Sequence, residues 1–224
     1  MNVGLLTRRN IWCPTLRGWI LLLAIFIAPV LLWWFKGESY LSLTERVPAE
    51  ILIVEGWLAP EELHAAGAEF VEGGYQYVVT TGRKVPGKLV QPEWTFAEIA
   101  ERELIQAGVP KDRIIAAPAT DNESTWELAA AVKRTLQDRG LDPKGVNVFT
   151  WGIHGRLSHL SFARALEPGV RVGVISWHPE DYESIRWWHS SLRARALISE
   201  TSGVFYETFF GSRTDSKSSV SGSL

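Results

Sequence analysis

The sequence holds a single cysteine, Cys13, among 224 residues. One cysteine excludes an intrachain disulfide framework and any cysteine-rich metal site. An excess of charge of one sign is missing as well, because 23 lysines and arginines stand against 25 aspartates and glutamates. A nucleic-acid-binding protein usually has a basic excess or a basic stripe, so we expect no nucleic-acid partner.

Several catalytic and cofactor motifs are missing too. The sequence has neither a Gly-x-Gly-x-x-Gly fingerprint nor a Walker loop, which argues against ordinary NAD or ATP binding. Without a Gly-x-Ser-x-Gly elbow a serine hydrolase is not expected. No HExxH motif occurs, and His154 and His159 are five residues apart, a spacing that does not place them on one helix face. We expect no metal centre, although a site assembled across loops from glutamate, histidine and aspartate stays open.

What the sequence does contain is a long uncharged apolar run at residues 18–35, GWILLLAIFIAPVLLWWF. Its length is at the lower end of what crosses a hydrocarbon core of about 30 Å, and tryptophans at both ends suit the membrane interfaces. A cleaved signal peptide is the alternative, but Trp33, Trp34 and Phe35 stand where small residues would be needed. The run therefore predicts a single-pass anchor in the cytoplasmic (inner) membrane.

Basic residues suggest the orientation of this anchor. Arg8, Arg9 and Arg17 precede the run, whereas Lys36 and Arg46 follow it among glutamates. The positive-inside rule then predicts that residues 1–17 are cytoplasmic and that the rest of the chain is extracytoplasmic.

Beyond the anchor, the sequence predicts a tether over residues 36–48, one domain over residues 49–210 and a polar, disordered tail over residues 211–224. Within the domain, apolar strand-like runs alternate with helical patterns. The strand-like runs are residues 51–54, 77–81, 113–117, 146–150 and 172–176, and the helical patterns are residues 60–71, 94–107, 124–136, 157–166 and 184–198. Such alternation predicts an α/β fold, a doubly wound, mainly parallel sheet of about five strands that is Rossmann-like.

The fourth strand-like run leads into the stretch that is richest in candidate chemistry. It stops at Thr150 and passes through Trp-Gly-Ile-His-Gly-Arg into a helix. In an open parallel sheet, ligands bind at the carboxyl ends of the strands, and the helix start that follows can hold an anion. We expect Gly152 and Gly155 to let the backbone approach a ligand. His154 suits proton transfer or donation to a phosphate, and Arg156 suits charge stabilisation. A solvated histidine and a surface arginine are the alternatives.

The first strand-like run contributes Glu55, Gly56 and Trp57 to the same edge. Because Glu55 closes an apolar strand, we expect it to be partly desolvated, which suits a general base or a partner of sugar hydroxyls. Pairing with Arg83 or Arg156 is the alternative. Gly56 is expected to permit a sharp turn close to a ligand.

Two further loops reach this edge. Thr81, Gly82 and Arg83 form a turn that suits phosphate oxygens, although a plain strand-ending turn fits equally well. Thr125 begins the next helix and supplies either a ligand contact or an early-helix hydroxyl, and Asp121 is a candidate for the helix cap.

Residues 51–210 contain the motifs "ILIVEGWL", "GGYQYVVTTG", "ELIQAGVPKDRI", "VFTWGIHGRLSHLSFARAL" and "RWWHSS". In these motifs, and in their order, the segment resembles the ElyC/SanA/YdcF family. His154 and Arg156 match the histidine and arginine of the family's strand-four motif. Arg83 departs from a common glycine, and the acidic run at residues 121–123 departs from the common loop. The resemblance implies a Rossmann-like fold and a role in envelope or peptidoglycan-precursor metabolism.

One member of that family is described as binding S-adenosylmethionine, but no residue here independently signals this cofactor, and the cofactor stays unknown. Three classes of function remain open. The first is an enzyme, a hydrolase or transferase, that acts on a phosphorylated, nucleotide-linked or lipid-linked envelope precursor. The second is a module that binds or senses a nucleotide-like ligand without turnover, and the third is an envelope scaffold. Protein partners are not indicated.

Overall fold

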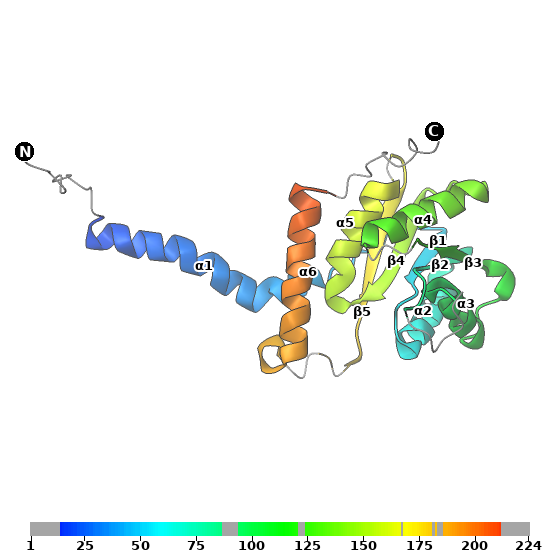
Figure 1. The fold of residues 1–224 in the computed structure, drawn as a ribbon, viewed down its shortest axis with the longest axis horizontal. Coiled ribbons are helices and arrows are strands. Elements are labelled where there is room, and N and C mark those ends of the chain that lie inside the picture. The colour runs from blue at the N-terminus through cyan, green and yellow to red at the C-terminus, as the bar shows by residue number, and fades with distance from the viewer. Residues whose placement is uncertain are drawn as a thin grey trace, which may run out of the picture. The chain divides into compact units, whose positions relative to one another are not determined.

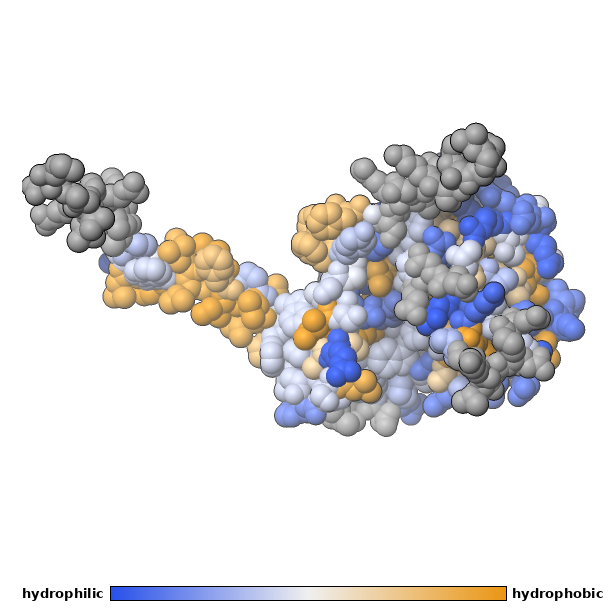
Figure 2. Space-filling view, viewed as in Figure 1, coloured by the Kyte–Doolittle hydropathy of each residue, from blue (hydrophilic) through white to orange (hydrophobic). Residues whose placement is uncertain are grey.

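The computed structural model describes residues 14–86, 94–120, 124–166, 168–180, 182 and 186–211. The chain forms two units, Met1–Gly37 and Glu38–Leu224. Helix α1, Leu16–Leu41, carries exposed apolar side chains along the first unit (Figure 2). Among the described residues it is the one helix long and apolar enough to cross a membrane. It contains the predicted span and extends beyond it at both ends.

The second unit is built on a five-stranded sheet (Figure 1). Its strands are β1 (Ile51–Glu55), β2 (Tyr77–Gly82), β3 (Ile114–Pro118), β4 (Gly145–Trp151) and β5 (Arg171–Trp177). All four strand pairs are parallel, and the spatial order is β3-β2-β1-β4-β5. The predicted doubly wound parallel sheet is confirmed.

Five helices belong to this sheet: α2 (Pro60–Gly73), α3 (Phe96–Gln106), α4 (Thr125–Asp138), α5 (Gly155–Leu166) and α6 (Ser191–Phe209). Alternate side chains of β1 divide the core between two layers. Ile51 and Ile53 pack with α4 and α5, whereas Leu52 and Val54 pack with α2 and α3. All four are at most 2% exposed. A central strand buried on both faces explains why its sequence is continuously apolar rather than alternating.

Short 3-10 turns complete the domain: η1 (Lys111–Arg113), η2 (Gly152–His154) and η4 (Trp187–His189). The start of α4 is capped by Ser124, whose hydroxyl accepts a hydrogen bond from the Glu127 N–H at 3.3 Å. Asp121, the predicted cap, lies outside the described residues.

The last helix differs from its prediction over residues 184–198. It begins at Ser191, because Ser190 caps it by accepting from the Arg193 N–H, and it continues to Phe209. Its second half is rich in hydroxyl side chains, which are poor helix formers. Thr201, Ser202 and Thr208 each donate to the carbonyl four residues earlier, so their hydroxyls are satisfied within the helix.

Residues 36–48, the predicted tether, include the end of α1 and a β-bridge. Residues up to Leu41 continue α1, and Glu45 then pairs with Val174 of β5 in an antiparallel bridge. The Asn147 side chain bonds both the N–H and the carbonyl of Val47 at 3.0 Å. The predicted tail lies outside the described residues except for Gly211.

Candidate functional site

The site lies between β1 and β4, where the strand order reverses. To one side of β1 the sheet continues with β2 and β3, and to the other with β4 and β5. The helices that follow β1 and β4 therefore leave on opposite faces, which opens a crevice at the carboxyl ends of these strands. Glu55 ends β1, and Thr150 and Trp151 end β4.

Glu55 is fully buried at this crevice. The Ser158 hydroxyl donates to its Oε1 at 2.9 Å, and the Thr150 hydroxyl donates to its Oε2. A buried carboxylate costs free energy unless it is hydrogen-bonded and paired with a cation. The two hydroxyls fix its position, and the cation comes from His154.

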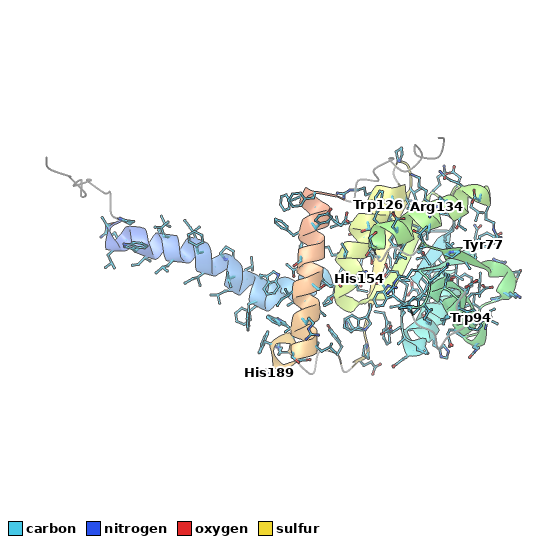
Figure 3. The ribbon with its side chains drawn as sticks, in the orientation of Figure 1. Tyr77, Trp94, Trp126, Arg134, His154 and His189 are labelled. Carbon is cyan, nitrogen blue, oxygen red and sulfur yellow. The ribbon has the colours of Figure 1, made fainter. Side chains whose placement is uncertain are left out.

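His154 lies in η2 beside α6 and links three elements (Figure 3). Its Nδ1 is 2.8 Å from Oε2 of Glu200 on α6. Its Nε2 is 3.7 Å from Oε2 of Glu55 and 3.4 Å from the Thr125 hydroxyl on α4. The Trp57 ring meets the imidazole edge to face, with the ring centroids 5.3 Å apart.

The charges around His154 determine its protonation state. Burial lowers its pKa, but the negative charge of Glu55, the hydrogen bond that His154 donates to Glu200 and the charge of Glu200 outweigh burial and raise the pKa to about 9. The ring is therefore an imidazolium at neutral pH, and both of its nitrogens donate. Nδ1–H donates to Glu200, while Nε2–H faces Glu55 and Thr125.

A cleft of about 350 Å³ opens at this point. It is lined by Trp57, Gly82, Arg83, Phe96, Thr125, Leu128, His154 and Glu200. Five of these were predicted from the sequence as site residues: Trp57, Gly82, Arg83, Thr125 and His154. They follow four different elements, so the parallel sheet gathers them at one edge.

Arg156 and Thr81 lie elsewhere. The Arg156 Nε donates to the carbonyl of Tyr40 at 2.6 Å, and its guanidinium lies 3.7 Å over the Tyr40 ring. It is not among the residues that line the cleft. Thr81 is buried and donates to the carbonyl of Leu128 at 3.3 Å. The Arg156 side chain thus contacts the last turn of α1, and the Thr81 side chain contacts α4.

The predicted glycines have close neighbours in the chain itself. A Cβ on Gly56 would lie 2.4 Å from the carbonyl oxygen of Phe96, and one on Gly155 would lie 1.8 Å from the Ser176 hydroxyl. These two glycines let β1 pack against the start of α3 and let α5 begin against β5. Gly152 has a positive φ of 26°, which few other residues adopt. Gly152 and Gly155 flank the turn that carries His154, whereas Gly56 serves the packing of β1.

Sequence reasoning missed three residues that line the cleft, Phe96, Leu128 and Glu200, and the two hydroxyls that hold Glu55. Glu200 lies beyond the predicted end of its helix at residue 198. Its role has no local sequence signal, because its partner His154 is 46 residues away in the chain.

The described residues contain no group of three or more histidine, cysteine, aspartate and glutamate side chains arranged to hold a metal ion. Glu55 and Glu200 are instead both directed at the imidazole ring of His154.

Comparison with known proteins adds little to this geometry. No family model matches the chain, and no solved structure matches it. A segment of 100 residues is 32% identical to part of a protein described as "Hybrid PKS-NRPS synthetase buaA" from Petromyces alliaceus. That segment is 45% of this chain and 2% of the synthetase, so the chain spans a very small part of that relative's length. A functional assignment therefore rests on the site.

Proposed function

We propose that this protein is a membrane-anchored envelope protein that binds a phosphorylated, nucleotide-linked or lipid-linked precursor at the carboxyl edge of its sheet. The observation that carries the proposal is the position of His154 on the wall of the cleft at the strand-order reversal, between Glu55 and Glu200, which raise its pKa to about 9. An imidazolium donates charge-assisted hydrogen bonds, which are about twice as strong as neutral ones, to an anionic oxygen.

Other residues of the cleft suit the same ligand. Arg83 lines the cleft and provides a second cation. Thr125 is the first residue of α4, and the positive dipole end of this helix favours a phosphate. Trp57 and Phe96 add flat apolar surfaces against which a base, a sugar or a prenyl unit can pack.

The protonation state also separates two kinds of chemistry. Glu200, His154 and Thr125 follow the order of an acid–histidine–hydroxyl triad, with 2.8 Å and 3.4 Å between successive partners. A triad histidine must accept the hydroxyl proton, but a pKa of about 9 leaves His154 already protonated at neutral pH. The second carboxylate, Glu55, therefore makes His154 a proton donor rather than a general base.

This charge state favours binding over turnover, since a general acid or base works best with a pKa near the operating pH. The second candidate function is therefore that of a binding or sensing module. Such a module would hold a nucleotide-like or S-adenosylmethionine-like ligand without turnover. The envelope assignment is supported by α1 and by the resemblance of residues 51–210 to the ElyC/SanA/YdcF family.

Calorimetry on the full chain in nanodiscs tests the proposal. Inorganic pyrophosphate, uridine diphosphate and farnesyl phosphate serve as probes at pH 7.5, and phosphate release is followed in the same samples. We expect at least one probe to bind and His154→Gln to weaken binding by about tenfold or more, because this change removes the charge. His159→Gln is the matched control, since His159 contacts the carbonyl of Val172 and does not line the cleft.

Two results would overturn the proposal. One is the failure of all three probes to bind to the wild-type protein. The other is equal affinity of the His154→Gln and His159→Gln variants, which would place the phosphate elsewhere.

A further inference from the structure

The end of α6 exposes a dense group of apolar side chains. We call this group the α6 aromatic face. It consists of four residues of the helix and the one that follows it, namely Ile198, Phe205, Tyr206, Phe209 and Phe210. Each of the five is more than half exposed, and the Phe205 and Phe209 rings lie 4.6 Å apart by their centroids. Hydrophobic side chains gather over this end of α6 in Figure 2. Soluble surfaces rarely carry so many adjacent aromatic side chains without a partner.

The opposite side of α6 is already used by the domain. Leu197 and Val204 are buried, and Glu207 is buried in a 2.9 Å ion pair with Arg164 of α5. Glu200 reaches the cleft and bonds His154 from this side. One side of α6 thus forms part of the site while the α6 aromatic face remains uncovered by the described residues.

Two features of the sequence bear on what covers the α6 aromatic face. The sequence after Gly211, SRTDSKSSVSGSL, is polar and contains few apolar residues. The uncharged run ends at Phe35 and the folded unit begins at Glu38, so only two residues separate them. With so short a connection, a domain behind a membrane anchor stays against the bilayer surface. Exposed phenylalanine and tyrosine are the side chains that membrane interfaces favour.

We propose that the α6 aromatic face binds the surface of the bilayer in which α1 is anchored, with its rings at the boundary of headgroups and acyl chains. This inference rests on the proposed function only through the anchor. An α-helix with its side chains is about 10 Å thick. The cleft would therefore lie one helix above the headgroups, within reach of a phosphate that stays attached to its lipid.

Spin labelling of the full chain in nanodiscs tests this placement. Cys13→Ser provides the background, Phe205→Cys and Phe209→Cys carry labels on the α6 aromatic face, and Val71→Cys carries the control label. Val71 is 66% exposed on α2, which covers the other layer of the sheet. We expect collisions with oxygen, relative to those with a water-soluble nickel chelate, to be several-fold more frequent at positions 205 and 209 than at position 71.

Equal ratios at all three positions would overturn the inference, because the α6 aromatic face would then be in water. Strong spin–spin coupling between labels of different chains, with both reagents excluded, would also overturn it and assign the face to a second copy. The labels do not enter the cleft, so pyrophosphate binding is measured on the same samples. Loss of the lipid contact with binding intact contradicts this inference alone, and the reverse outcome contradicts only the proposed function.

Discussion

The sheet has a hollow at its amino edge, where the strands begin, and another at its carboxyl edge, where they end. Each hollow lies beside a network of polar side chains, yet the chemistry of the two networks differs. The hollow at the amino edge measures about 400 Å³ and the cleft at the carboxyl edge about 350 Å³. Volume alone therefore does not show which one binds a ligand. The partners and charges of the polar groups do separate them.

At the amino edge, the polar side chains form hydrogen bonds with one another. Asn147 bonds Val47 and donates to the Tyr75 hydroxyl at 2.9 Å, and Tyr75 in turn donates to Glu69. Arg46 closes the network with two hydrogen bonds to Glu69 at 3.0 and 2.8 Å. Burial raises the pKa of Tyr75 to about 12, so its hydroxyl keeps the proton that it donates. One cation meets one carboxylate, and the network joins Arg46 and Val47 to the rest of the domain.

At the carboxyl edge, two carboxylates share one histidine. Glu55 and Glu200 together keep His154 charged, and the ring forms part of the cleft wall with 14% of its side chain exposed. Both cations are thus paired with carboxylates, and the edges differ in that two carboxylates hold His154 charged at the cleft wall whereas a single carboxylate pairs with Arg46. We therefore interpret the first edge as a joint and propose the second as the site.

The largest expected effect concerns the pH dependence of stability at the carboxyl edge. The pKa of His154 is raised from its ordinary 6.5 to about 9, so its stabilisation is fully present below pH 6.5 and is lost as the pH rises through 9. The free energy of unfolding should fall by about 3 kcal/mol across this window. Urea unfolding in detergent measures it, and His154→Gln should remove this slope. Parallel profiles of the two proteins would contradict the assignment.

Asn147→Ala probes the amino edge. The change leaves the N–H and the carbonyl of Val47 without their side-chain partner, and each such loss costs about 1–3 kcal/mol. We expect a destabilisation of about 2 kcal/mol or more in urea unfolding, with unchanged pyrophosphate affinity under folding conditions. A weaker affinity at full folding would mean that the two edges are coupled.

Glu200→Gln and Glu69→Gln form a matched pair, one at each edge. Glu200→Gln removes a charge next to His154 and should lower the pKa of His154 by about one unit. It should also tighten pyrophosphate binding several-fold, because a negative charge leaves the cleft. Glu69→Gln should change neither quantity. Carbon-detected NMR of the histidine side chains and calorimetry measure the two effects, and equal responses of the two variants would remove the distinction between the edges.

The smallest effect is expected for Arg46→Ala. The Arg46 side chain is 53% exposed, and an ion pair of this kind contributes about 1 kcal/mol or less. Its contribution should decrease further in high salt. A loss of several kcal/mol in urea unfolding would show that the amino-edge joint depends on its charges rather than on Asn147.

Most of the fold could be predicted because each strand is a short apolar run between turn residues. The predicted strands agree with β1 to β5 within one residue at each end. His154, Thr125, Trp57 and Arg83 could be placed together for the same reason, since each follows a strand and parallel strands end at one edge.

The positions of three side chains differ from what the sequence suggested, and each difference has a physical cause. Side chains alternate between the two faces of a strand, which turns Thr81 to the α4 layer. Residues two apart at a helix start point in different directions, so Arg156 reaches Tyr40 while His154 faces the cleft. Glu200 comes from the half of α6 where hydroxyl residues interrupt the apolar pattern, and only the tertiary packing of α6 on α5 brings it to His154.

The measurement that tests the account most directly is an NMR titration of His154 in the full chain, with and without inorganic pyrophosphate. We expect its ring to titrate near pH 9 and its resonances to shift on addition of pyrophosphate at pH 7.5, while those of His159 stay in place. A His154 that titrates at or below pH 6.5 and does not respond to pyrophosphate would contradict an anion site built on a charged histidine.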